Sequence, residues 1–148
     1  MSVGIEYEES ADIPQNDGID IGIKDLSVCS DGNTYKNINN TSKIKHIKKK
    51  QRRLQSKVSR KYLKNKKGGS YCKTSNIVKS EKQLLKLNHR LTNIRHNRLY
   101  QITSEIINRK PMFIVLEDLN VSDMMKNKHL AKAVQEQCFY ELYRQLEY

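Results

Sequence analysis

Two carboxylates stand at positions where a strand pattern does not favour them. Asp20 lies between Ile19 and Ile21 in the run Gly-Ile-Asp-Ile-Gly, and Glu117 closes the apolar run 112–116. Strands disfavour aspartate, and a carboxylate beside a core is costly unless it is paired or bound to a metal. Carboxylates at the ends of neighbouring strands converge, and hard divalent ions such as Mg²⁺ prefer oxygen ligands of this kind.

Such a pair of carboxylates predicts phosphodiester chemistry. Two divalent ions about 4 Å apart can activate a water molecule and stabilise the leaving oxygen of a phosphodiester. The same pattern also fits a structural role, in which Asp20 satisfies a turn and Glu117 is the first solvated residue after a strand. From spacing alone both interpretations stay open, because perturbed carboxylates are often structural.

Other common kinds of site are not indicated by the sequence. The three cysteines form no CxxC pair, and the four histidines show no ligand spacing, so neither a disulfide framework nor a zinc site is predicted. The segment 18–22 has two glycines but lacks the third glycine, opening a helix, that a dinucleotide site needs.

Charge points to a polyanionic partner. The chain of 148 residues has a formal net charge of +12, and residues 43–110 hold 22 Lys and Arg against two acids. Residues 1–20 hold six acids and no Lys or Arg. Cations that neutralise phosphates release condensed counterions, which favours nucleic acid over the alternative of a solvated basic surface.

The elements that must position these residues follow from hydrophobic periodicity. Residues 18–23, 26–29 and 34–38 predict two or three antiparallel strands, with a turn at Asp31-Gly32. The apolar run 112–116 predicts a strand buried on both faces, and residues 131–148 predict a last helix.

Between these strands the sequence predicts a basic helical hairpin over residues 41–110. Its helices span 41–64 and about 76–108, joined by a flexible tip at Lys66–Ser70 and ended by Pro111. The cations that we expect to bind nucleic acid are Lys45, Lys48, Lys49, Lys50, Arg52, Arg53, Lys57, Arg60, Lys61, Lys64, Arg90, Arg95 and Arg98.

Four motifs in order carry a resemblance to a known family. GIDIGIKDLSVCSDG, the basic hairpin, IVLEDLNV and MMKNKHLAKAV together resemble the TnpB family of insertion-sequence proteins, often described as transposases. The resemblance implies an RNA-guided DNA endonuclease with a ribonuclease-H-like (RuvC) core. In that core Asp20 and Glu117 would be catalytic and would bind Mg²⁺ or Mn²⁺. Asp118 lies next to Glu117 in the sequence. The resemblance also implies guide RNA and target DNA as partners of the hairpin.

Departures from the family pattern shape the expected organisation. Residues 1–17 are expected to be the end of an N-terminal domain and a linker, with a strand at 2–8, and residues 18–148 an incomplete α/β RuvC-like domain. The family's four-cysteine zinc segment and third catalytic aspartate are absent from this chain. We therefore expect a truncated piece that binds nucleic acid and cuts little alone.

Two alternatives remain. The GIDIG strand is also similar to the phosphate-binding strand of the sugar kinase, actin and chaperone ATPase superfamily, although Ile23-Lys24 replaces the usual Thr or Ser. A non-catalytic RNA- or DNA-binding module would explain the charge but not the carboxylates. No apolar leader or run of 18 apolar residues is present, so the sequence predicts a cytoplasmic protein without a membrane partner.

Overall fold

The computed structural model describes residues 17–117 and 119–147. The strand expected at 2–8 and the linker expected at 9–16 lie outside the described residues. Asp17, the last residue of the expected linker, is instead the first residue of a strand.

A mixed sheet of four strands, in the order β3-β2-β1-β6, forms the base of the fold. The strands are β1 (Asp17–Ile21), β2 (Asp25–Cys29), β3 (Thr34–Lys36) and β6 (Ile114–Leu116). The first three are antiparallel neighbours, as predicted, and β6 runs parallel to β1.

The prediction that the apolar run 112–116 is buried on both faces is wrong. Only Ile114 and Leu116 are half-buried, whereas Phe113 and Val115 are 52% and 57% exposed. Side chains alternate between the faces of a strand, and among the described residues only the face that Ile114 and Leu116 share with Ile19 is covered.

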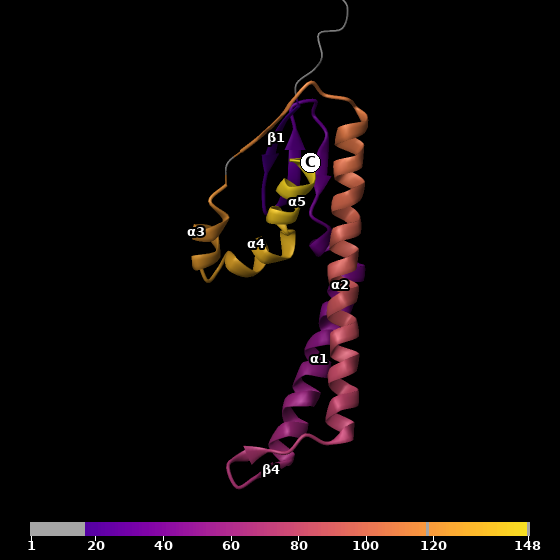
Figure 1. Cartoon of the computed structure of the whole chain (residues 1–148), viewed down its shortest axis with the longest axis vertical. Coiled ribbons are helices and arrows are strands. Elements are labelled where there is room, and N and C mark those ends of the chain that lie inside the picture. The colour runs from indigo at the N-terminus through magenta and orange to yellow at the C-terminus, as the bar shows by residue number, and fades with distance from the viewer. Residues whose placement is uncertain (1–16, 118, 148) are drawn as a thin grey trace, which may run out of the picture.

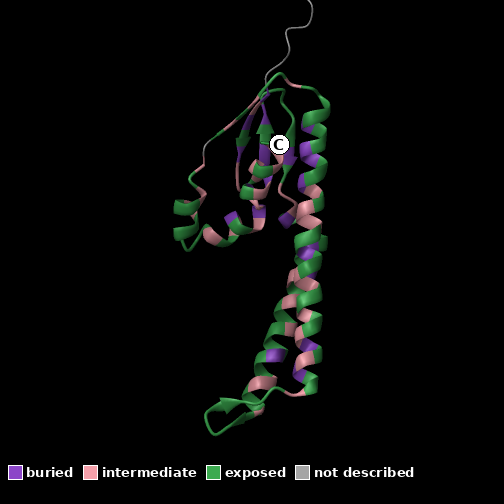
Figure 2. Cartoon of the chain, in the orientation of Figure 1, coloured by how far each residue is buried: buried purple, intermediate pink, exposed green. Residues whose placement is uncertain are grey.

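The helical hairpin is present with nearly the predicted bounds. Helix α1 spans Ser42–Lys64 and α2 spans Ser75–Asn108. In Figure 1 the hairpin projects away from the sheet, with only the C-terminal half of α2 beside it. Ile44, Ile47 and Leu91 form a small core where the helices leave the sheet, after the short 3₁₀ helix η1 (Ile38–Asn40). Farther out most positions are exposed (Figure 2).

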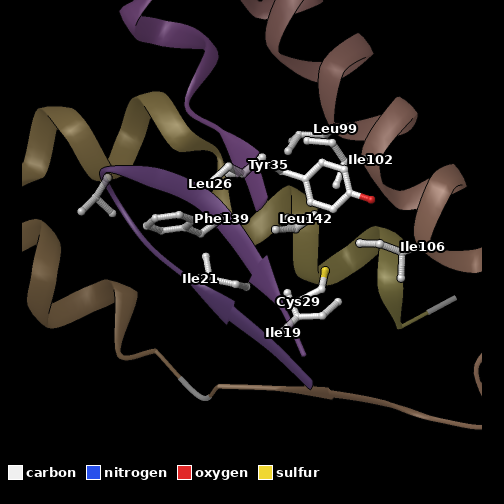
Figure 3. Packing of buried hydrophobic residues seen from close by; sticks show 11 residues of the cluster. Ile19, Ile21, Leu26, Cys29, Tyr35, Leu99, Ile102, Ile106, Phe139 and Leu142 are labelled. Carbon is white, nitrogen blue, oxygen red and sulfur yellow. The ribbon is translucent and has the colours of Figure 1, made fainter. Parts of the chain in front are cut away.

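The C-terminal segment folds into three short helices. They are α3 (Val121–Lys126), α4 (Ala131–Gln137) and α5 (Phe139–Leu146). The single helix predicted over 131–148 is therefore wrong, because Cys138 adopts a left-handed conformation with φ 56° and separates α4 from α5. That bend turns Phe139 and Leu142 into the core beneath the sheet (Figure 3).

The main core joins one sheet face, the end of α2 and α5 (Figure 3). Its buried members are Ile19, Ile21, Leu26, Cys29, Tyr35, Leu99, Ile102, Ile106, Val134, Phe139 and Leu142. Among the described residues, no helix has the length and apolar character that crossing a bilayer requires.

Candidate functional site

The strand register brings the two predicted carboxylates together. In the parallel pairing of β1 with β6, Ile19 lies beside Leu116, so the next residues along the strands are Asp20 and Glu117. Because side chains alternate, both leave the covered face, and both are exposed. Two carboxylates separated by 97 positions in the sequence thus lie at one point of the sheet edge.

The electrostatics of the pair reflect this proximity. A hydrogen bond with Asp20 raises the pKa of Glu117, with smaller contributions from burial and from the charge of Asp20. Like charges at short distance favour retention of one proton. A divalent cation would relieve the same repulsion by neutralising both carboxylates.

The structure does not complete a metal site around this pair. Among the described residues, no group of three or more His, Cys, Asp or Glu side chains is arranged to hold a metal ion. Asp118, which the sequence placed beside Glu117, lies outside the described residues.

Tyr143 of α5 forms a hydrogen bond with the backbone at Glu117. The sequence did not predict this contact. The hydroxyl of Tyr143 donates to the carbonyl oxygen of Glu117, and the amide of Leu119 lies 3.4 Å from the same hydroxyl. The residue type gave no indication of this role, because it arises only when α5 folds back beneath the sheet.

A second polar cluster was also missed, at the start of β1. Arg109, which follows α2, donates to the hydroxyl of Tyr35 at 2.6 Å and forms an ion pair with Asp31. Its guanidinium lies 3.7 Å from Asp17, whose side chain is buried. A backbone hydrogen bond from Asn33, together with Arg109, lowers the pKa of Asp31. These contacts fix the end of the hairpin to the sheet.

Most of the predicted nucleic-acid-binding cations are exposed on the hairpin. Among the described residues, those that are exposed and form no ion pair are Lys45, Lys49, Lys50, Arg52, Arg53, Lys57, Arg60, Lys64 and Arg90; Arg98 is half-buried and also forms none. Their charges are therefore available to an external polyanion.

Three predicted cations are engaged inside the molecule instead. Lys48 contacts Glu136 at 2.5 Å, and Arg95 lies 3.6 Å from the same carboxylate. Lys61 donates to the carbonyl of Asn76 and to the hydroxyl of Ser80. Glu136 therefore ties α4 to the hairpin through Lys48 and Arg95.

A basic groove of about 430 Å³ lies between α1 and α2. We call it the hairpin groove; it is lined by Lys50, Arg53, Leu54, Lys57, Gln83, Lys86 and Leu87. Its four cations are exposed and, among the described residues, none of them forms an ion pair. The sequence prediction omitted Lys86, because only the packing of the helices shows which face of α2 borders the basic face of α1.

Comparison with known proteins relates the chain to a family of probable transposases. Residues 3–128 match the OrfB_IS605 family, described as "Probable transposase". A protein of Escherichia coli (strain K12), "Putative RNA-guided DNA endonuclease InsQ", is 30% identical over 146 residues, which cover 88% of this chain and 33% of that protein.

A second relative gives a similar result. "Putative RNA-guided DNA endonuclease" of Streptomyces pristinaespiralis is 30% identical over 131 residues, covering 88% of this chain and 29% of that protein. The chain thus spans about a third of the length of these curated relatives.

Proposed function

This chain belongs to the OrfB_IS605 family of probable transposases, and from that premise we propose that it is the carboxylate-bearing part of an RNA-guided DNA endonuclease. The names of both curated relatives support this activity. The chain spans about a third of the length of these relatives.

We assign the catalytic role to Asp20 and Glu117, in a ribonuclease-H-like (RuvC) sheet. The observation that carries this assignment is the parallel register of β1 and β6, which sets the two carboxylates side by side. Both side chains are exposed on the uncovered face, where a phosphodiester can approach. Tyr143 positions the chain at Glu117 from the opposite side.

The donor set fits a divalent cation. Two carboxylates supply hard oxygen ligands of the kind that Mg²⁺ or Mn²⁺ prefers. The hydrogen bond with Asp20, which raises the pKa of Glu117, shows that the two groups are close enough to share one ion. Asp20 and Glu117 would hold such an ion, which supplies Lewis-acid activation of water and stabilisation of the leaving oxygen. Further ligands would have to come from outside the residues described.

The hairpin would supply the binding energy for the nucleic acid. In RNA-guided recognition, base pairing reads the sequence while the protein contacts backbone and shape. The exposed cations of α1 and the hairpin groove suit that task, because they present positive charge without a preference for any base. Guide RNA and target DNA are therefore the partners that we propose.

Divalent-ion binding by the carboxylate pair tests the assignment directly. Titration with Mn²⁺, followed by calorimetry and by the thermal unfolding midpoint, should show binding and stabilisation of the unaltered chain, because a ligand bound only by the native state stabilises it. The double substitution Asp20→Asn with Glu117→Gln should abolish both effects. Glu147→Gln, which removes another exposed glutamate outside the pair, is the matched control.

A second candidate function is a binding module without catalysis. It is favoured by the finding that, among the described residues, no third ligand joins Asp20 and Glu117. Unchanged Mn²⁺ binding in the double variant, or no binding by the unaltered chain, would refute the metal assignment and leave this module as the function.

A further inference from the structure

The far end of the hairpin, where the sequence predicted a flexible tip, is a two-stranded ribbon. Strands β4 (Lys66–Lys67) and β5 (Ser70–Tyr71) pair with each other. Gly68 and Gly69 form the turn between them, with φ angles of 49° and 88°. Positive φ at both central residues matches the twist of a two-residue hairpin. The amide of Cys72 donates to the carbonyl of Asn65 at 3.1 Å and closes the ribbon onto the end of α1. Figure 1 shows this tip at the point farthest from the sheet.

Aromatic and aliphatic side chains are exposed at this tip. Tyr71 is 55% exposed and Leu63 is 64% exposed. The ring of Tyr71 meets that of Tyr62 edge-on, with centroids 6.2 Å apart. Together with Ser59 these side chains line an open hollow of about 370 Å³, which we call the tip hollow.

Cations flank the residues of the tip hollow in the sequence. Arg60, Lys64, Lys66 and Lys67 are exposed, and among the described residues none of the four forms an ion pair. The ammonium of Lys66 lies 5.7 Å from the centroid of the Tyr71 ring. From residue 43 to residue 80 the sequence has no acid. Glu81 accepts a hydrogen bond from the hydroxyl of Tyr62 at 2.6 Å, and Lys73 pairs with the same carboxylate. An exposed apolar hollow with unpaired cations beside it complements a ligand with a flat apolar part and an attached anion.

An unpaired nucleotide has that chemistry, because its base has an apolar π-face and its phosphate carries the charge. We propose that the tip hollow is a stacking site for one unpaired base of a single strand, which rests on the ring of Tyr71 while Lys66 and Lys67 contact the flanking phosphates. The proposal deepens the nucleic-acid binding assigned to the hairpin and rests on it. Stacking of a base on an aromatic ring is tolerant of sequence.

Two oligonucleotides of equal length and charge, one with bases and one without, distinguish base stacking from phosphate binding. The unaltered chain is titrated, by fluorescence anisotropy, with a short oligothymidine and with an abasic strand of the same length. Stacking predicts an affinity about 5- to 150-fold higher for the strand that carries bases. Tyr71→Ala should reduce the ratio of the two affinities to about one. It should leave the affinity for the abasic oligonucleotide unchanged, because the cations remain.

Two further variants isolate the aromatic ring. Tyr71→Phe keeps the ring and should keep the affinity ratio. Tyr100→Ala removes a tyrosine on α2 that is 53% exposed, close to the 55% of Tyr71, and should also keep it. Because the chain has no tryptophan, Tyr71→Trp introduces a single tryptophan, whose fluorescence oligothymidine should quench and the abasic strand should not. Far-ultraviolet circular dichroism confirms that each variant folds.

The outcomes distinguish this site from the general binding function. If both strands bind but Tyr71→Ala leaves the affinity ratio unchanged, the tip hollow is not a stacking site and nucleic-acid binding by the hairpin stands. A ratio of one in the unaltered chain overturns the proposal in the same way. If neither strand binds, both the stacking site and the proposed binding function are overturned.

Discussion

Removal of three cations from the hairpin groove should change how nucleic-acid binding depends on salt. The perturbation is Arg53→Ala with Lys57→Ala and Lys86→Ala, at positions that are exposed on helices and form no ion pair within the described structure. Alanine has the highest helix propensity, so the helices should persist. Each phosphate contact contributes about 0.9 to the slope of log K against log salt for a duplex.

Three lost contacts should therefore reduce the magnitude of that slope by about 2.7. Between 50 and 200 mM salt the logarithm of the concentration changes by about 0.6, so the unaltered chain should lose about 40-fold more affinity than the variant over this range. The assay is anisotropy of a labelled RNA–DNA heteroduplex, titrated at four salt concentrations from about 50 to 200 mM.

The matched control removes the same charge elsewhere. Lys24→Ala with Lys36→Ala and Lys128→Ala also lowers the net charge by three, at exposed positions outside the hairpin. Its slope should stay close to that of the unaltered chain. Equal slopes for the groove variant and the control would refute the reasoning, because binding would then follow net charge and not the cations of the hairpin groove.

Two further predictions concern stability. Hydrogen bonding to Asp20 raises the pKa of Glu117 in the folded chain. The proton on Glu117 therefore stabilises the folded chain at low pH, and this stabilisation is lost as pH rises through that pKa. Glu117→Gln should therefore gain stability relative to the unaltered chain in denaturant unfolding as pH rises from about 4 to 7; a relative loss would contradict the shift. Phe139→Ala, at a side chain 1% exposed, should cost about 3–5 kcal/mol in urea unfolding. Its control, Tyr140→Ala, at 78% exposure, should stay within about 0.5 kcal/mol, and equal losses would show that Phe139 is not in the core.

Local pattern was sufficient for the elements with strong periodicity. Helices α1 and α2 begin and end within one residue of the bounds that apolar spacing predicted. The three antiparallel strands formed in the segments predicted for them, with ends that differ by up to two residues. A helix or strand of this kind depends on side chains that are near in sequence, so its signature is visible without the fold.

Which residues are buried could not be predicted from the local sequence pattern. The run 112–116 is apolar throughout, yet among the described residues β6 is covered on one face only, because coverage depends on which other segments pack there. The residues 131–148 have one continuous helical pattern, yet Cys138 breaks it. The packing of Phe139 and Leu142 beneath the sheet accompanies that break and is a long-range contact.

The candidate site also has features set by the sequence and features set only by the tertiary structure. The sequence by itself determined the residue types: two carboxylates at strand positions that disfavour them, a basic hairpin, and family membership carried by the motifs that contain both. The tertiary structure alone decided that Asp20 and Glu117 meet, that Lys48 and Arg95 both pair with Glu136, and that Lys86 faces the groove. The physical reason is that charge and periodicity are local properties of a chain, whereas strand register and helix pairing bring together residues far apart in it.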